Sequence, residues 1–295
     1  MKFALMLGGP PPDQYAGIAA LAEDAGFESV FVADHVVFPP QLPATYPHTA
    51  DGVPPVLPTV PLFDPLVVLG AVATATTSIR LGTGVYLLPL RHPLHVARML
   101  VTVDALSGGR VTLGVGVGWL EDEFAALGAS FGSRGRRTDE MIAVLRRLFA
   151  EDVVAHSGDS FSWPPMRFEP KPARPEGIPI EIGGMSAAAM RRAGTVGDGW
   201  LESGSKDLTD LAGRIDIVLG HRAAAGRGGP FEITSRMPAS FDPAAVQAHA
   251  EIGVTRIASR PPVAHGSRPG ADDYQRFIER YARTVIEPYG AGHPS

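Results

Sequence analysis

Asp34 and His35 carry the first candidate chemistry in this chain. They follow a short apolar run, Glu28–Ala33, and a histidine beside a carboxylate can act as an acid or a base near neutral pH. A histidine in this setting can equally be a structural hydrogen-bonding residue, and the sequence leaves both interpretations open. His92 has a similar pair of interpretations, because it either lines a site or marks the start of a helix.

A second candidate is the Gly-Gly-Met-Ser turn, Gly183–Ser186, which leads from a predicted strand into a predicted helix. Free backbone N–H groups at such a turn suit a phosphate, and the Ser186 hydroxyl could donate to it. The alternative is an ordinary tight turn in which Ser186 only caps the helix. The three arginines at 134, 136 and 137 also have two interpretations, as partners of an anionic ligand tail or as a solvated turn.

Alternating glycines mark the third candidate, a strand that begins at Arg110. Successive strand residues point to opposite faces. One face is therefore apolar and carries Val111, Leu113, Val115 and Val117. The other face is almost bare of side chains and carries Thr112, Gly114, Gly116 and Gly118. The bare face predicts a cavity for a flat ligand at the carboxyl end, or else close packing of an outer helix. The preceding strand, Ile79–Val85, repeats this pattern at Gly82 and Gly84, which favours the cavity.

Strands and helices alternate along the whole chain. The predicted strands are Lys2–Leu7, Glu28–Ala33, Ile79–Val85, the stretch from Arg110, Ile178–Ile182, Gly199–Leu201, Phe231–Met237 and Val254–Ala258. The predicted helices include Tyr15–Ala25, Leu66–Thr76, Pro93–Leu106, Thr138–Ala150 with Thr138 as its cap, Leu208–Ala225, Pro243–Glu251 and Asp272–Ile286. This order predicts parallel neighbours, right-handed crossovers and one α/β domain over 1–295, a (β/α)8 TIM barrel with insertions.

Two segments interrupt the alternation. Residues 36–62 are rich in proline and predict a lid loop over a binding site, and residues 151–177 predict an insertion that carries a small hairpin.

The composition of the chain excludes several classes of function. The net charge of −5 and the pI near 6.0 argue against nucleic-acid binding, and the absence of Cys excludes thiolate chemistry. No motif predicts a metal site or a membrane span, so we expect a cytoplasmic protein that acts on a small molecule.

Several motifs, taken together and in order, resemble the bacterial luciferase-like monooxygenase superfamily. They are ADH at 33–35, GTGVYLLPLRHP at 82–93, LSGGRVTLGVGVGWLEDEFAALG from 106, IEIGG at 180–184 and GDGW at 197–200. The nearest resemblance is to the branch of oxidoreductases that use the deazaflavin coenzyme F420. It covers roughly residues 1–220.

The resemblance implies a barrel whose cofactor ring lies at the carboxyl ends of the strands. The ring would rest on a bulge at Gly84 and Val85, with a non-prolyl cis peptide bond between them, and near Gly116, Gly118 and Trp119. The phosphate clasp maps onto Gly183, Gly184, Met185 and Ser186, and the catalytic positions onto His35 and Asp34. A homodimer is expected by the same analogy. The sugar-phosphate dehydrogenases of the superfamily have a glutamate near the place where this chain has Trp119, so a sugar-phosphate substrate is not expected.

The function implied is hydride transfer between F420 and a small organic substrate. Two alternatives stand beside it. One is an FMN-dependent monooxygenase of the same family, and the other is a flavin-binding barrel without catalytic activity.

Overall fold

Eight parallel strands close into a barrel in the described part of the chain, which a computed structural model provides for residues 1–47, 49, 51–236, 241–262 and 267–292. The strands are β1 (Lys2–Leu7), β2 (Ser29–Val32), β3 (Arg80–Thr83), β5 (Val111–Gly116), β8 (Ile180–Gly183), β9 (Gly199–Leu201), β10 (Glu232–Arg236) and β11 (Arg256–Ser259). Pairing of β3 with β5 and of β1 with β11 closes the ring. The predicted TIM barrel is confirmed.

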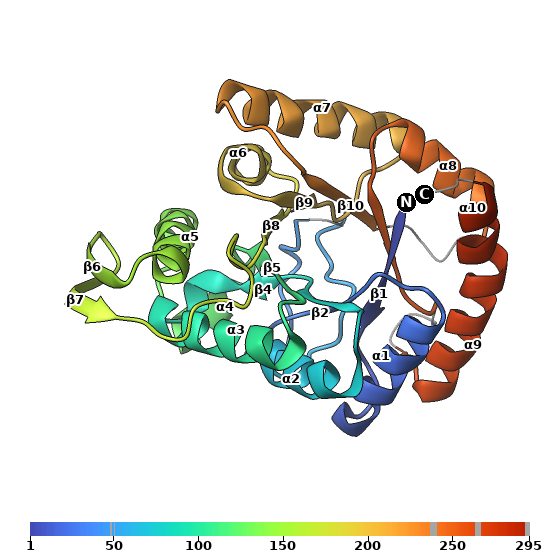
Figure 1. The fold of residues 1–295 in the computed structure, drawn as a ribbon, viewed down its shortest axis with the longest axis horizontal. Coiled ribbons are helices and arrows are strands. Elements are labelled where there is room, and N and C mark those ends of the chain that lie inside the picture. The colour runs from blue at the N-terminus through green and yellow to red at the C-terminus, as the bar shows by residue number, and fades with distance from the viewer. Residues whose placement is uncertain (48, 50, 237–240, 263–266, 293–295) are drawn as a thin grey trace.

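Helices surround the barrel on its outer side (Figure 1). They are α1 (Tyr15–Asp24), α2 (Pro65–Ala75), α3 (Pro93–Ser107), α4 (Glu121–Ala126), α5 (Arg134–Ala150), α6 (Ala187–Val196), α7 (Leu208–Ala224), α8 (Pro243–Glu251), α9 (Ala271–Tyr281) and α10 (Glu287–Gly292). A π-helical turn over Ala282–Ile286 separates α9 from α10, where the sequence predicts one continuous helix. Within the described residues, every helix is too short or too polar to span a lipid bilayer.

The alternation of side chains along the strands separates two apolar clusters. Outward residues such as Leu5, Val30 and Leu113 pack with the helices in the main core. Inward residues form a small second cluster inside the barrel, made of Ala4, Phe31, Leu201 and Ala258. The face of β5 that carries Val111, Leu113 and Val115 is therefore the outer one, and its glycine face points into the barrel, as predicted.

A buried ion cluster closes the amino-terminal end of the barrel interior. The guanidinium of Arg256 is 2.9 Å from Glu181 Oε2 and 3.3 Å from both Glu28 and Glu232. Burial alone would lower the pKa of Arg256, but the three carboxylates more than offset that effect and raise it. The cluster therefore lies at the end of the barrel interior opposite the carboxyl ends of the strands.

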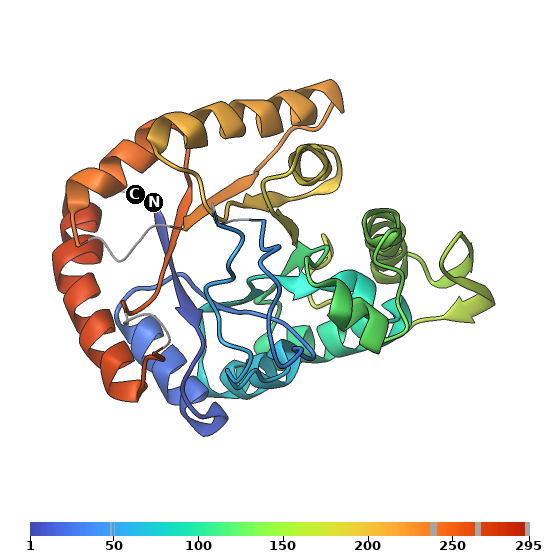
Figure 2. The same ribbon diagram turned by 180° about the vertical axis from the view of Figure 1, so that it is seen from behind.

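Two insertions depart from the regular alternation. Residues 36–62 carry no helix or strand in their described part and run across the barrel in Figure 2. Residues 151–177 carry the predicted hairpin, β6 (Val153–Ser157) and β7 (Ser162–Arg167), which projects from the barrel (Figure 1). Glu140 of α5 holds this hairpin through a 2.8 Å contact with His156 Nε2.

Three details differ from the sequence predictions. Helix α5 begins one turn earlier than predicted, so Thr138 does not cap it; the Thr138 hydroxyl donates instead to Arg134 O within the helix. Helix α4 has its own acidic first turn, which the sequence did not separate from the preceding strand. Strand β10 ends at Arg236, and Met237, the predicted last residue, lies outside the described residues.

Gly114 is a position at which β5 and β3 approach each other too closely for a side chain. A Cβ atom there would lie 1.9 Å from Thr83 O and 2.7 Å from a Leu201 methyl group. We expect Gly114→Ala to lower the free energy of unfolding by about 1–3 kcal/mol, because the neighbouring backbone must move. In the control variant Gly70→Ala, the new methyl group in α2 meets nothing within 4 Å, so equal or higher stability is expected. Urea unfolding curves measure both, and a Gly114→Ala protein as stable as the control would contradict this account of the packing.

Glu23 predicts a stability loss in acid. Its carboxylate accepts hydrogen bonds from the backbone N–H groups of Thr77 and Ile79, just before β3. Its slight burial raises the pKa, but these backbone hydrogen bonds, with those of Ser78, lower it to about 2. A carboxylate with a depressed pKa stabilises the fold above its unfolded value near 4.5 and loses that contribution as the pH falls toward 2.

The test compares the wild type with Glu23→Gln. We expect the wild type to be more stable by about 1 kcal/mol at neutral pH, a value discounted for solvent screening. The difference should shrink between about pH 4.5 and pH 2. Thermal melts of both proteins across this range measure the effect, and a difference independent of pH would contradict the assignment.

Candidate functional site

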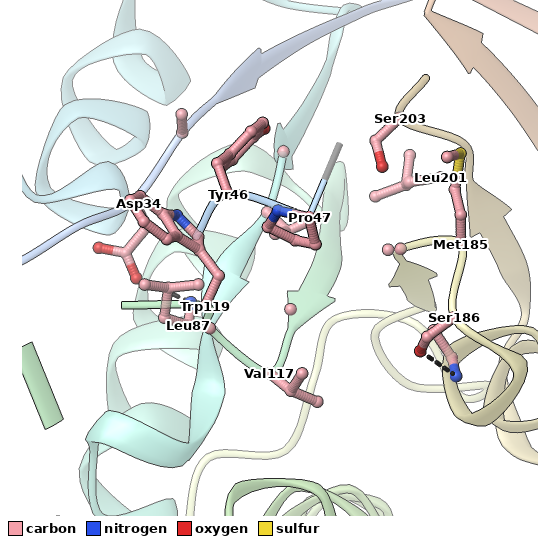
Figure 3. A pocket seen from close by; sticks show the side chains of 18 of the residues that line it. Asp34, Tyr46, Pro47, Leu87, Val117, Trp119, Met185, Ser186, Leu201 and Ser203 are labelled. Atoms are coloured by element: carbon pink, nitrogen blue, oxygen red, sulfur yellow. Dashed lines mark hydrogen bonds between the residues drawn. The ribbon is translucent and has the colours of Figure 1, made fainter. Parts of the chain in front are cut away.

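A cavity of about 920 Å³ opens at the carboxyl ends of the barrel strands. This volume lies in the range of pockets that bury a cofactor or a drug-sized ligand. All nine residues that the sequence analysis assigns to cofactor binding line the cavity, and so do His35 and Asp34. Figure 3 shows Trp119 and Asp34 on one side of it and Met185, Ser186 and Ser203 on the other. The structure thus brings the predicted residues together, and their roles remain proposals.

A bulge between β3 and β4 (Tyr86–Leu87) forms the floor of the cavity. Three residues, 83–85, lie opposite only two residues of β5, 113–114, between the flanking paired positions. The peptide bond Gly84–Val85 is cis, which confirms that prediction. The Val85 side chain lies over the neighbouring strands, because a Cβ at Gly116 or Gly183 would meet its methyl groups at 2.4 or 2.5 Å.

This packing corrects one part of the glycine interpretation. The glycines do not leave their whole face open to a ligand. Thr83 and Leu201 fill the space above Gly114, and Val85 fills the space beside Gly116 and Gly183. A flat ligand would therefore contact the Val85 bulge rather than a bare strand surface.

His35 is held by a carboxylate that the sequence analysis did not assign. Its Nδ1 atom is 2.9 Å from Glu123 Oε2, and Glu123 Oε1 accepts the backbone N–H groups of Val36 at 2.5 Å and Val37 at 3.4 Å. The Glu123 side chain is 0% exposed, whereas that of His35 is 16% exposed. Contact through Nδ1 leaves Nε2 as the ring nitrogen available to a ligand.

Asp34 makes a different set of contacts. Its carboxylate is bidentate with Arg91, at 2.5 and 2.8 Å, and accepts the Leu87 N–H at 2.8 Å. Burial raises the pKa of Asp34, and Arg91 partly offsets this effect. Arg91 also lies over the Tyr86 ring, 4.3 Å from its centroid. Asp34 thus ties the end of β2 to β4, and its carboxylate oxygens are engaged by protein groups.

The turn at Gly183–Ser186 combines both of its predicted features. Gly184 has a φ of +108°, and the Ser186 side chain accepts a hydrogen bond from Ala189 N at 3.2 Å as the cap of α6. Arg214 of α7 reaches the same turn and donates to Met185 O at 3.3 Å. The Gly184 N–H donates to Leu201 O at 3.3 Å. The donors that the turn offers to the cavity are therefore the N–H groups of Met185 and Ser186, the Ser186 hydroxyl and the Arg214 guanidinium, which together suit an anion.

Aromatic side chains line the opposite wall. Trp119 lies edge-on to Tyr46, with ring centroids 5.2 Å apart, and edge-on to His35 at 6.0 Å. Phe38 packs against His35 at 4.7 Å. Tyr46 comes from the segment 36–62, so this segment contributes to the wall of the cavity, with Pro43, Thr45 and Pro47 also lining it.

Several charged residues in or beside the cavity were missed or left open by the sequence analysis. Arg134 lines the cavity and donates to Gly118 O at 3.2 Å, so one member of the arginine cluster does face the site. Glu202 and Arg236, from the ends of β9 and β10, also line it. Glu123 could have been suspected only from its place after the strand glycines, since an acidic first turn usually indicates a solvated helix start.

His92 does not belong to the cavity lining. It caps α3, and its Nδ1 accepts the Leu94 N–H at 3.3 Å. Of the two interpretations in the sequence analysis, the structure therefore supports the start of a helix. Among the described residues, no three histidine or acidic side chains are grouped in a way that could hold a metal ion.

Comparison with known proteins gives relatives along most of the chain. An uncharacterised protein of Mycobacterium tuberculosis is 33% identical over 275 residues, covering 92% of this chain and 94% of the relative. The F420-dependent glucose-6-phosphate dehydrogenase of Beutenbergia cavernae is 32% identical over 238 residues, covering 79% of this chain and 65% of that enzyme.

The fold has matches among solved structures. The coenzyme F420-dependent tetrahydromethanopterin reductase of Methanopyrus kandleri superposes with a TM-score of 0.76 at 18% identity, covering 98% of this chain and 99% of the other. This match supports the barrel architecture. Residues 2–286 match the family described as luciferase-like monooxygenase, and the chain belongs to that family.

Proposed function

We propose that this protein is an F420-dependent oxidoreductase that transfers a hydride between the deazaflavin and a small organic substrate. One observation carries the proposal: His35, fixed by a buried carboxylate, opens onto a cavity with the Val85 bulge as its floor and an anion-suited turn on its far side. The identity of 32% to an F420-dependent dehydrogenase supports the choice of cofactor.

The residues present fit such a cofactor. The Val85 bulge offers an apolar surface for one face of a flat ring, and Ser186 and Arg214 offer donors for its phosphate. When bound, the deazaflavin supplies a carbon atom that accepts or donates the hydride.

His35 would act on the oxygen atom of the substrate. Because Glu123 engages Nδ1, the Nε2 atom is the one that can take a proton from a substrate hydroxyl or return one to a carbonyl. Glu123 fixes the ring orientation and would stabilise the charged imidazolium. Asp34 is proposed here as a positioning residue, since its carboxylate is already bound by Arg91 and Leu87.

The aromatic wall would exclude water during the transfer. Trp119 and Phe38 contact the His35 ring, and Tyr46 packs edge-on against Trp119, so the histidine is bordered by apolar surface. Exclusion of water strengthens polar interactions within a site and prevents side reactions. The segment 36–62 would act as the lid that completes this wall.

The cofactor proposal predicts selective binding. We expect purified protein titrated with oxidised F420 to bind it with a Kd in the micromolar range or below, and FMN about 10-fold or more weakly, as measured by cofactor fluorescence. Ser186→Ala should weaken F420 binding several-fold, through the lost hydroxyl donor and the altered turn. Gly17→Ala, in open space on α1, is the control. Tight FMN binding without F420 binding would instead favour the FMN-dependent monooxygenase.

The role of His35 predicts a loss of turnover without a loss of cofactor. The assay offers primary and secondary alcohols with oxidised F420, and ketones and enones with the reduced form. For any compound turned over, His35→Ala should lower kcat by about 10²–10⁴-fold, with the F420 Kd changed by less than about 3-fold. His95→Ala, an exposed histidine on α3, should match the wild type. Unchanged kcat in His35→Ala would contradict the assignment.

Glu123 has a separate test because it acts through His35. Glu123→Gln preserves the shape of the side chain but removes its charge, so we expect kcat to fall about 10-fold or more and the pH dependence of kcat to change, while KM changes little. Glu176→Gln, at an exposed position outside the cavity lining, is the matched control. A purely structural role would lower thermal stability and leave the pH profile of kcat unchanged.

A further inference from the structure

Arg236 stands apart from the other arginines at the cavity. Arg91 is paired with Asp34, Arg214 with Asp210 at 2.9 Å, and Arg134 donates to two backbone carbonyls. The Arg236 side chain lines the cavity and is exposed to it, and within the described residues no carboxylate lies within ion-pair distance of its guanidinium.

The backbone around Arg236 is fixed by Glu202. This buried carboxylate accepts the Arg236 N–H at 3.2 Å with one oxygen, and the Gly204 N–H at 2.5 Å with the other, which also accepts from Ser205 N. Glu202 is 2% exposed, and both of its carboxylate oxygens accept hydrogen bonds from the chain itself. It orients the end of β10 and leaves the guanidinium directed to the cavity.

Charges near Arg236 favour an anion at this place. Burial among protein atoms lowers the pKa of Arg236, and Arg260 lowers it further, while Tyr46 and Glu202 oppose these effects. The charges at this part of the cavity are therefore the guanidinium groups of Arg236 and Arg260 and the carboxylate of Glu202. Burial raises the pKa of Tyr46, so its hydroxyl stays protonated and can donate a hydrogen bond.

We propose that Arg236 and Tyr46 form a subsite for a carboxylate carried by the substrate, which makes the substrate an organic acid with an apolar body. The planar guanidinium suits a carboxylate in a bidentate arrangement. Trp119, which lines the cavity, faces the apolar body. A dianionic phosphate is disfavoured by the neighbouring Glu202. This inference deepens the proposed function and rests on it for the assignment of the acid as substrate.

Paired probes test the subsite directly. Phenylacetate and cyclohexanecarboxylate are compared with their uncharged amides, and phenyl phosphate tests the alternative anion. Calorimetric titrations use the wild type, Arg236→Gln, Arg236→Lys and the surface control Arg276→Gln, each with and without saturating F420. The control removes one positive charge from α9, where Arg276 is 68% exposed, and thereby isolates the local effect from net charge.

We expect the wild type to bind each acid about 10-fold or more tightly than its amide. Arg236→Gln should abolish this preference, Arg236→Lys should restore part of it, and Arg276→Gln should retain it. Absence of a preference, or an equal preference in Arg236→Gln, would overturn the subsite. So would tighter binding of phenyl phosphate than of the acids, or a loss of F420 affinity in Arg236→Gln with acid binding intact, which would assign Arg236 to the cofactor.

The same titrations separate the two proposals. If F420 does not bind but the acid preference and its dependence on Arg236 persist, the subsite stands and the proposed function fails. If F420 binds with the acid preference absent, the subsite fails and the proposed function stands. Thermal melts of each variant verify folding, and Arg236→Ala, with the same expected loss of preference, replaces Arg236→Gln if that variant does not fold.

Discussion

Close approach of the end of β3 to β5 is the constraint on which the rest of the site depends. Thr83 O lies where a Cβ of residue 114 would be, and the Thr83 hydroxyl donates to Gly114 O at 2.8 Å. Only glycine at 114 permits this approach. The extra residue of the adjoining bulge then pushes Val85 across the barrel mouth, where Gly116 and Gly183 make room for it. Glycines on β5 and β8 thus make room for Val85, which forms a raised apolar floor.

The polar groups of the site are held by neighbours rather than by their own strands. Asp34 anchors the end of β2 to β4 through Arg91 and the Leu87 N–H, and the next residue, His35, is thereby directed to the cavity, where Glu123 fixes its ring. These two adjacent residues consequently have different roles. Asp34 holds the backbone and His35 faces the cavity, although the sequence alone predicted both as catalytic residues.

The parts predictable from the sequence are those governed by local periodicity. The alternation from Val111 to Gly118 indicated which face of β5 points inward, and the Gly-Gly-Met-Ser turn indicated the start of α6. Glu123 could not be found in this way, because its partner His35 is 88 residues away and an acidic first turn resembles a solvated helix start. Arg236 was missed for a similar reason, since β9 and β10 are short and only barrel closure brings their ends to the cavity.

The start of α5 shows how a reasonable local signal can mislead. Threonine is a good N-cap and Thr138 precedes an amphipathic stretch, but the chain continues the helix back to Arg134. Arg134 lies over Phe131, 3.8 Å from the ring centroid, and its contact with Gly118 O joins α5 to the end of β5. A tertiary contact, which the local sequence does not encode, therefore sets this helix boundary.

The central claim is that the Val85 floor and the Gly184 turn hold one deazaflavin between them. A crystal structure of the protein with F420 bound tests this most directly. The account predicts the ring on the Gly84–Val85 bulge, its phosphate at the N–H groups of residues 185 and 186, and His35 Nε2 facing the reactive side of the ring. A ring bound elsewhere, or one whose phosphate lies away from that turn, would contradict it.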